Sequence, residues 1–404
     1  QVFDLDSGKC TKKKYWDINQ IEQEEISEKK ASEKLDFLIH NAVKIRLRSD
    51  VPVEVNLSGG LDSGAIAAHA SEILKNKGET LTTHTFKYLN NAALDESKNA
   101  KIISDYCGTD HHVVTFDSDE VWEGVDDLIH KIEEPVHSMA SYVQWLGWKK
   151  ISEKGFKVIL HGSSNDELML GYSYSSKIED IRRIKSGNIP KNIQGHSLLH
   201  YKSLGRISKW LLQGDFINPD IKKYYDHPIV PGIQRDFLQD NLKNFNSFET
   251  DKSNMNKSAL DRRLADMNFF RIPYWNNFMD KSMMSIPIEV RMPFLDVDLV
   301  NFCMGLPAEY FYKDGLTKSL LRDTLRERLP KEIVQDKFKK GFTVPKREWL
   351  INHEKYFEEV FESNAVKDVI DINFLKNNYK SMDPNILWRI INFSKWAHIF
   401  NVKV

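Results

Sequence analysis

The short segment "SGGLDS" at Ser58–Ser63 combines residue types that can hold a charged ligand. It places two hydroxyls, two glycines and one carboxylate between an apolar segment and an alanine-rich segment. The glycines allow a ligand to approach the backbone closely, and the amides that open the following helix would point at an anion. Asp62 would repel a bare phosphate, but it suits Mg²⁺, which binds one or two carboxylates together with phosphate oxygens. The segment therefore predicts a site for magnesium-bound pyrophosphate.

A second polar segment, "GSSNDE" at Gly162–Glu167, also follows an apolar stretch. If the two apolar stretches are neighbouring parallel strands, both polar loops leave the same edge of the sheet, and Asp62 and Asp166 converge on one point. The simpler interpretation of a lone SGG is a glycine turn with a capping side chain. The segment also matches neither GxGxxG nor the Walker pattern with its lysine. The pairing of the two loops favours the magnesium site over a plain turn.

The elements that must position these loops alternate between strands and helices, which predicts an α/β fold with a doubly wound parallel sheet of about five strands. The predicted strands cover 53–57, 80–88, 111–116 and 156–162, and the predicted helices cover 27–48, 64–75, 95–106, a segment from 117, and 139–153. Strand patterns fade beyond Tyr172, so the second half is predicted to be mainly helical. Residues 185–258 are expected to form poorly packed helices and long loops.

The composition narrows the class of protein. The formal net charge is −1, which gives no electrostatic case for a nucleic acid or an anionic membrane as partner. No apolar run approaches the roughly 20 residues that span a bilayer, and the N-terminus has no signal-peptide pattern. The three cysteines, Cys10, Cys107 and Cys303, lie far apart. They argue against structural zinc and disulfides, and we expect a cytoplasmic protein.

Several further motifs give the chain a resemblance to a known family. "SGGLDS" matches the pyrophosphate loop of the PP-loop ATP pyrophosphatases, and the segments after it resemble the synthetase domain of the asparagine synthetase family, in family order from about Tyr15 to Leu350. The matching segments are "DESKNAKIISDYCGTDHH", "EEP" at Glu133–Pro135, "DELMLGY" at Asp166–Tyr172, "IEVRMPFLD" at Ile288–Asp296, "TKSLLR" at Thr317–Arg322 and "KKGFTVPKREWL" at Lys339–Leu350.

The resemblance implies an activity and a set of site residues. That family joins ATP to a substrate carboxylate, releasing pyrophosphate and forming an acyl-adenylate, and then lets ammonia or an amine displace AMP. ATP and Mg²⁺ are the implied cofactors, with Asp62 and Asp166 as metal ligands. Lys318 matches the lysine that neutralises the reacting phosphates, where a preplaced cation favours the transition state. The other implied contacts to ATP are Ser58, Gly59, Gly60 and Ser63 at the pyrophosphate, Leu57, Thr85 and Phe86 around adenine, and Gly162 at the ribose.

The chain departs from the family pattern beside the reacting carboxyl group. At the loop after the fourth strand, asparagine synthetases have a motif similar to "GEGxDE". The position of that motif's first glutamate is occupied by Ser163 in this sequence. Serine has no useful basicity near neutral pH, and Glu167 is the nearest candidate for a base. Because of Ser163, we predict that the enzyme amidates a carboxylate other than free aspartate as readily as it amidates aspartate itself. The substrate is expected to be a small-molecule or peptide carboxylate, with ammonia or an amine as the second substrate.

The resemblance also divides the chain. Residues 1–26 resemble the segment that follows the family's glutaminase domain, 27–180 form the PP-loop ATP-binding core, and 181–404 form the helical portion that completes the synthetase domain. The family's glutaminase uses an N-terminal cysteine, whereas this sequence begins with Gln1 and has Cys10 inside a polar stretch. We therefore expect a processed product or a fragment, with a glutaminase portion that preceded it or resides on another chain.

Three other functions compete with ordinary asparagine formation. The first is a specialised amide ligase of the same family that closes a lactam or a macrolactam. The second is a PP-loop enzyme that acts on tRNA, which the neutral charge and the lack of cysteine pairs disfavour. The third is an ATP-binding subunit with a regulatory role, an alternative that Ser163 keeps open although both aspartates and Lys318 are retained.

Overall fold

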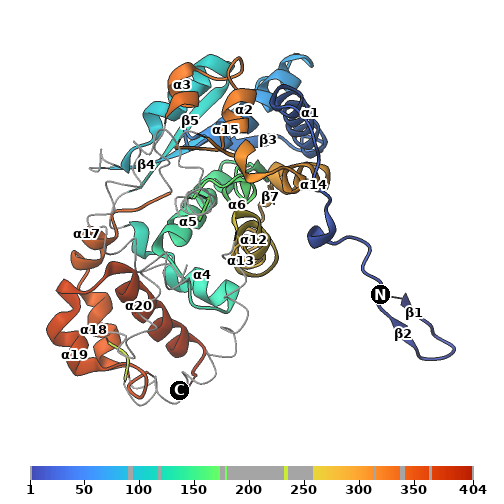
Figure 1. Ribbon diagram of the computed structural model, residues 1–404. Coiled ribbons are helices and arrows are strands. Elements are labelled where there is room, and N and C mark those ends of the chain that lie inside the picture. Colours follow the sequence, from blue (N-terminus) through green and yellow to red (C-terminus); the bar gives the residue numbers. More distant parts are fainter. Residues whose placement is uncertain are drawn as a thin grey trace, which may run out of the picture.

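The computed structural model describes residues 2–89, 94–116, 120–172, 178–179, 232–234, 258–313, 315–336, 342–363 and 366–402 (Figure 1). Within these ranges lies a five-stranded parallel sheet whose strand order is β5-β4-β3-β6-β7. The strands are β3 (Val53–Asn56), β4 (Thr82–Tyr88), β5 (Asp110–Phe116), β6 (Val158–Leu160) and β7 (Glu289–Arg291). The predicted α/β fold with a doubly wound parallel sheet is confirmed.

The strand order places a reversal between β3 and β6. From β3 the chain adds β4 and then β5 on one side, and β6 and β7 lie on the other. Val53 pairs with Val158, and Val55 pairs with Leu160, so the two central strands end at nearly the same level. The loops after β3 and β6 therefore leave side by side, at the position where ligands bind in such sheets.

Helices cover both faces of the sheet, as expected from a doubly wound fold. On one face, α1 (Glu28–Arg46), α2 (Leu61–Lys75) and α3 (Ser97–Cys107) bury side chains together with Leu57 and Leu160. On the other face, α4 (Val125–Ile132) and α5 (Met139–Glu153) pack with Phe116 and Ile159. Ile159 and Leu160 face opposite cores because successive side chains of a strand alternate between the two faces.

The fifth strand comes from a segment whose strand character was not predicted. β7 pairs with β6 at the edge of the sheet, and only three residues form it. Its arginine, Arg291, donates to both carboxylate oxygens of Glu289 at 2.7 and 3.2 Å, and to the carbonyls of Arg46 and Arg48 at the end of α1. Three residues, two of them charged, are too few to show the alternation of apolar and polar side chains that marks a strand in a sequence. Only the pairing of β7 with β6 identifies it as a strand.

Two predicted helix starts differ from the structure. α2 begins at Leu61 rather than Gly64, because the glycine loop itself turns into the helix, with extended Gly60 as its N-terminal cap. α3 begins at Ser97 with Glu96 as its N-terminal cap, whereas Asp95 was the predicted cap; the Asp95 side chain accepts a hydrogen bond from the Ser97 amide at 2.9 Å. The predicted helix start at residue 117 lies outside the described residues.

The second half is mainly helical in its described parts, as predicted. Its helices are α12 (Ala259–Ala265), α13 (Ile272–Met284), α14 (Val297–Gly305), α15 (Ser319–Thr324), α16 (Lys331–Gln335), α17 (Lys346–Ile351), α18 (Lys355–Glu362), α19 (Ile372–Asn378) and α20 (Pro384–Ile399). None of the helices in the described ranges has both the length and the apolar character that crossing a bilayer demands. The loops predicted for 185–258 lie almost wholly outside the described residues, and the predicted domain division at residues 26 and 180 stays a prediction.

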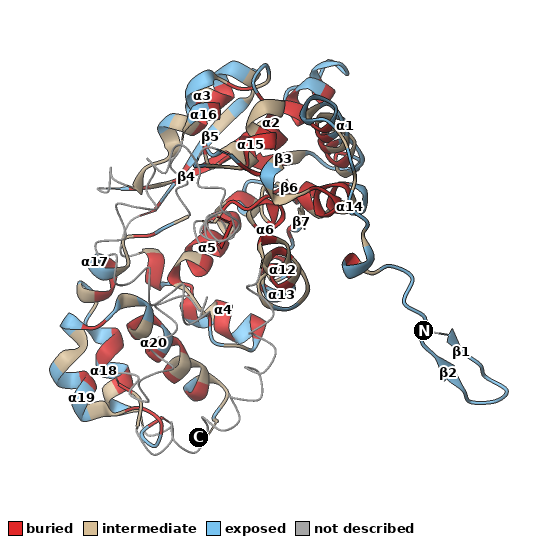
Figure 2. Ribbon diagram, in the orientation of Figure 1, coloured by how far each residue is buried: buried red, intermediate tan, exposed pale blue. Residues whose placement is uncertain are grey.

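The N-terminal segment extends from the body as a small hairpin of β1 (Val2–Phe3) and β2 (Cys10–Thr11) (Figure 1). Nearly all of it is exposed (Figure 2). After the hairpin, Trp16 contacts the rest of the protein: its indole donates a hydrogen bond to the side chain of Asn301 on α14 at 2.9 Å. From that contact onward the chain runs toward α1, which Ser27 caps through the Lys30 amide.

Candidate active site

Three charged side chains from distant segments meet at the carboxyl ends of β3 and β6. Asp62 lies in the first turn of α2, Asp166 lies in the first turn of α6 (Asn165–Leu168), and Lys318 directly precedes α15. The Lys318 ammonium lies 2.6 Å from Asp166 Oδ1 and donates to Asp62 Oδ2. The predicted convergence of the two aspartates is present, and Lys318 is the cation that they share.

A buried amide links the two polar loops directly. Asn165 has no exposed surface, and its Nδ2 donates to Asp62 Oδ1 at 2.6 Å. Each oxygen of the Asp62 carboxylate therefore has a donor, one from α6 and one from Lys318. Asn165 was not identified from the sequence as a site residue. Its position between Ser164 and Asp166 in the second polar loop was a signal that could have identified it.

Burial and charge act in opposite directions on Lys318. The side chain is only 4% exposed, and burial lowers the pKa of its ammonium, while the neighbouring charges of Asp62 and Glu167 oppose that shift. A buried lysine is stabilised as a cation by carboxylates within hydrogen-bond distance. The ammonium is therefore held in place by charge as well as by packing, and removing either aspartate takes away part of that support.

Strained backbone is concentrated at this site. Lys318, Ser164 and Leu170 adopt left-handed conformations with φ of 55°, 75° and 54°, which non-glycine residues rarely adopt. Each such residue costs about 1–3 kcal/mol and persists only where the surroundings hold it. Lys318 is held by a hairpin of β8 (Tyr312–Lys313) and β9 (Leu316–Thr317) on one side and by α15 on the other. Arg322 strengthens this junction by donating to the Thr317 carbonyl at 2.9 Å.

The glycine loop is closed by its own serines. The hydroxyls of Ser58 and Ser63 lie 3.0 Å apart, and the Ser58 amide donates to the Ser63 hydroxyl at 3.2 Å. Gly59 has a φ of +79°, and a Cβ there would lie 2.7 Å from the Ala100 amide nitrogen. No side chain caps the N-terminus of α2 at Gly60. The first amides of a helix attract an anion, and the helix dipole favours negative charge there.

Two further glycines let the loops approach one another. A Cβ at Gly162 would lie 3.0 Å from the Ser63 amide nitrogen. At Gly171 it would lie 1.9 Å from Asp166 Oδ1 and 2.5 Å from Lys318 Cε. Any side chain at residue 171 would therefore displace one of the charged groups. Gly171 belongs to the family motif at 166–172, but the sequence does not mark it as a site residue, because the contact with Lys318 that requires a glycine crosses from one segment to another.

The three residues predicted around adenine all have buried side chains. Leu57 is fully buried, and its amide donates to the His84 carbonyl of β4 at 2.7 Å. Phe86 points into the core, where its ring meets Phe116 edge to face. Thr85 is buried, and its hydroxyl has no hydrogen-bond partner among the described residues. Leu57 and Phe86 have no polar side-chain atom, so the Thr85 hydroxyl is the side-chain group of these three residues that could form a hydrogen bond with a nucleotide.

Ser163 is fixed by two aromatic neighbours. Its hydroxyl lies 2.6 Å from His161 Nδ1 and accepts a hydrogen bond from the Trp275 indole at 3.3 Å. Burial lowers the pKa of His161 to about 4, so the imidazole is neutral and accepts the hydrogen bond from the serine. His161 and Trp275 were not anticipated from the sequence, because neither matches a motif and Trp275 lies on α13.

Glu167 lies beside the site and differs from the two aspartates in its environment. It is 7% exposed, and its carboxylate accepts a hydrogen bond from the Tyr172 hydroxyl at 2.9 Å. Burial raises the pKa of Glu167, which the tyrosine hydrogen bond only partly opposes. A carboxyl group whose pKa moves toward neutrality is better suited to exchange protons at neutral pH. The role of Glu167 as the base stays a prediction.

The donor set fits magnesium. Asp62 and Asp166 already share one cation, the Lys318 ammonium, so their carboxylates are close enough to share another. Carboxylate oxygens with room for phosphate oxygens are what Mg²⁺ prefers. The glycines that let the two loops close leave no Cβ to fill the space beside the carboxylates. The residues present therefore suit both a metal ion and a phosphorylated ligand.

Comparison with known proteins gives a consistent result. A family model described as asparagine synthase matches residues 34–398. The glutamine-hydrolyzing asparagine synthetase 1 of Bacillus subtilis is 24% identical over 98% of this chain and 63% of its own length. The glutamine-hydrolyzing asparagine synthetase 2 of Arabidopsis thaliana is 28% identical over 56% of this chain and 46% of its own, and the amidase chyE of Penicillium rubens is 26% identical over 40% and 26%. The chain thus spans less than two thirds of the length of each relative.

Proposed function

Because the chain belongs to the asparagine synthase family, we propose that it is an ATP-dependent amide ligase that releases AMP and pyrophosphate. The observation that carries the proposal is the meeting of Lys318, Asp62 and Asp166 beside the N-terminus of α2, whose cap is Gly60. This arrangement presents a cation, two metal-binding carboxylates and helix amides to one anionic group. An arrangement that only turned the chain would need none of the three.

The proposed reaction has two steps. An oxygen of the substrate carboxylate attacks the α-phosphorus of ATP, the bond from that phosphorus to the bridging oxygen breaks, and pyrophosphate leaves. The nitrogen of ammonia or an amine then attacks the acyl carbon, and AMP leaves with the electron pair of the broken C–O bond. Mg²⁺ bound by Asp62 and Asp166 would supply charge neutralisation for the phosphates.

This chain's own residues would act mainly by positioning and by charge. The amides at the start of α2 and the hydroxyls of Ser58 and Ser63 would bind the leaving pyrophosphate. Lys318 would stabilise the negative charge that builds on it, without any reorganisation during the step, because hairpin and helix already hold the ammonium in place. Glu167 would accept the proton that the attacking amine loses.

The neighbours of Ser163 bear on which carboxylate is amidated. A hydroxyl fixed by His161 and Trp275 offers a hydrogen bond to an acyl oxygen, but no negative charge to an attacking ammonium. We propose that the acceptor includes carboxylates other than aspartate, and lactam or macrolactam closure is the second candidate for the same site. We propose that ammonia comes from a glutaminase portion, either on the N-terminal side of residues 1–26 or on another chain. In the first case residues 1–26 would link the glutaminase portion to the synthetase domain.

Product analysis tests the proposal. The chain is incubated with ATP, Mg²⁺, ammonia and a panel of carboxylates that includes aspartate, and the nucleotides are separated. We expect AMP and pyrophosphate in equal amounts, together with exchange of labelled pyrophosphate into ATP that requires the carboxylate. Omitting the carboxylate is the control. ADP and phosphate as products would exclude the proposed reaction.

Ser163→Glu is expected to raise ammonia-dependent asparagine formation from aspartate. A positioned base contributes roughly 10² to 10⁴ in rate, and the substitution places a carboxylate where the family's asparagine-forming members have one. The assay measures asparagine across pH for the wild-type chain, for Ser163→Glu, and for Ser163→Gln as a control of the same shape without the charge. Robust wild-type asparagine synthesis that Ser163→Glu damages would show that the acceptor site is that of an ordinary asparagine synthetase.

A further inference from the structure

Two helices outside the candidate active site bring together three side chains that commonly bind metals. His40 lies on α1, while His69 and Glu72 stand three residues apart on α2, a spacing that places both on one face of that helix. One donor atom from each of the three lies within 4.8 Å of the others. His69 is buried, His40 is half-buried and Glu72 is exposed, so the cluster reaches from the core to the surface.

The central histidine lacks partners. His69 has no exposed surface, and both of its ring nitrogens are without a hydrogen-bond partner among the described residues. The nearest carboxylate, Asp36 on α1, lies 3.5 Å from Nε2, which is long for a hydrogen bond. Most buried polar side-chain atoms are hydrogen-bonded, and each exception calls for an explanation such as a bound ion.

We propose that His40, His69 and Glu72 form a binding site for a divalent transition-metal ion of the zinc type. Two imidazoles and one carboxylate are a common ligand set for such ions, whereas Mg²⁺ and Ca²⁺ prefer oxygen alone. A tetrahedral ion places its donors about 3.4 Å apart, given bonds of about 2.1 Å. The three side chains therefore close by roughly an ångström onto the ion, a movement within reach of their rotamers, and water takes the fourth position.

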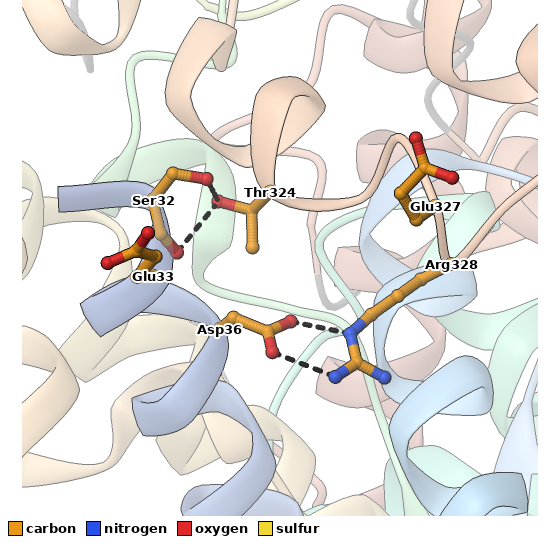
Figure 3. Close-up of a pocket in the computed structure, with 6 residues that line it drawn as sticks. All are labelled: Ser32, Glu33, Asp36, Thr324, Glu327 and Arg328. Atoms are coloured by element: carbon orange, nitrogen blue, oxygen red, sulfur yellow. Dashed lines mark hydrogen bonds and ion pairs between the residues drawn. The ribbon is translucent and has the colours of Figure 1, made fainter. Parts of the chain in front are cut away.

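The groups around the cluster resemble the outer shell of a metal site. Metal-binding histidines usually have a carboxylate nearby, and Asp36 is the carboxylate that lies nearest to His69. Arg328 in turn binds both oxygens of Asp36 at 2.6 and 2.8 Å (Figure 3) and donates to one oxygen of Glu72 at 2.6 Å. Arg328 bonds Oε2 of Glu72, and we assign the other carboxylate oxygen, Oε1, to the ion.

A surface pocket adjoins this cluster. It has a volume of about 420 Å³, and Figure 3 shows Asp36 and Arg328 in its wall together with the hydrogen-bonded pair of Ser32 and Thr324. Asp36 lines the pocket and also lies beside His69. Only this side chain therefore separates the pocket from the buried histidine of the cluster. The guanidinium of Arg328 repels a nearby cation, so we expect a moderate affinity rather than that of a structural zinc site.

Metal binding by the whole chain tests this site. The probe is Zn²⁺ measured by equilibrium dialysis, with Co²⁺ as a spectroscopic substitute, on protein without a histidine tag and in excess Mg²⁺, which occupies the carboxylate site proposed at Asp62 and Asp166. We expect one Zn²⁺ per chain and a tetrahedral Co²⁺ absorption spectrum, with affinity weakened roughly tenfold or more in His40→Gln and in Glu72→Gln. Both substituted residues have solvent-accessible surface, so neither variant is expected to unfold the protein.

The matched control is His112→Gln. His112 pairs with Asp110 at 3.0 Å on β5, an exposed histidine–carboxylate pair outside the cluster, so its loss should leave the affinity unchanged. Absence of stoichiometric Zn²⁺, an octahedral Co²⁺ spectrum, or binding that neither His40→Gln nor Glu72→Gln weakens would each overturn the proposal. The measurement reads metal content, so its outcome is independent of the proposed ligase activity.

Discussion

Asp62→Ala and Asp166→Ala are each expected to lower turnover by roughly a hundredfold or more, which is the effect of removing one preorganised electrostatic group. The two carboxylates hold Lys318 from two sides, and they are the oxygen donors proposed for Mg²⁺. Either substitution removes a metal ligand and also one of the charges that support the buried ammonium. The measurement is the rate of carboxylate-dependent pyrophosphate release at saturating ATP.

Variants of the same shape separate the loss of charge from the loss of packing. Asp62→Asn and Asp166→Asn keep the volume of each side chain and should still lose most of the turnover. Asp110→Asn removes an exposed carboxylate that pairs with His112 away from the site, and it should leave turnover unchanged. Turnover within a few-fold of wild type in both alanine variants, in protein that remains folded, would contradict the proposed role of this carboxylate pair.

Lys318→Met should depress turnover strongly while changing the apparent affinity for ATP and for the carboxylate only a little. The ammonium opposes charge that appears on the leaving pyrophosphate as the bond breaks, so its contribution is larger in the transition state than in the ground state. Methionine keeps a chain of similar length in the same buried space, which limits the cost in packing. Steady-state kinetics at several concentrations of each substrate separate the two effects.

A lysine on the same hairpin provides the control for this substitution. Lys313 is exposed and pairs with Glu28, so Lys313→Met removes a positive charge nearby without touching the carboxylates. It should have kinetic constants close to those of the wild-type chain. If Lys318→Met instead raised only the Michaelis constants, Lys318 would bind substrate rather than stabilise the transition state, and its assigned role would be wrong.

Local patterns were enough to predict the sheet and its two polar loops. Short apolar stretches gave β3 and β6, and the loops after them met as expected because parallel strands share one carboxyl edge. The same patterns could not locate β7, which is polar and short and is defined only by its pairing with β6. Lys318 followed from the family resemblance alone, because nothing in its local sequence points to the loops that it joins.

Most of the missed site residues share a physical cause. Asn165 and Gly171 act through contacts with groups on other segments, so their importance depends on distances that no local pattern encodes. His161 contacts Ser163 within the same loop, but it belongs to no motif that marks it as a site residue. Trp275 is the clearest case, since its indole reaches Ser163 from 112 residues further along the chain. An isolated tryptophan is more often part of a core than of a site, and only the fold shows which hydroxyl this one reaches.

The late position of β7 in the chain has a consequence for how the protein is made. β6 ends at Leu160 and its outer partner begins only at Glu289, so translation leaves one side of β6 unpaired for a time on the order of ten seconds. An unpaired strand edge invites association with other chains. The closing contact between Lys318 and Asp62 spans 256 residues, which places the assembly of the site among the last events of folding. We therefore expect a newly made chain to be most prone to association with other chains before β7 pairs with β6.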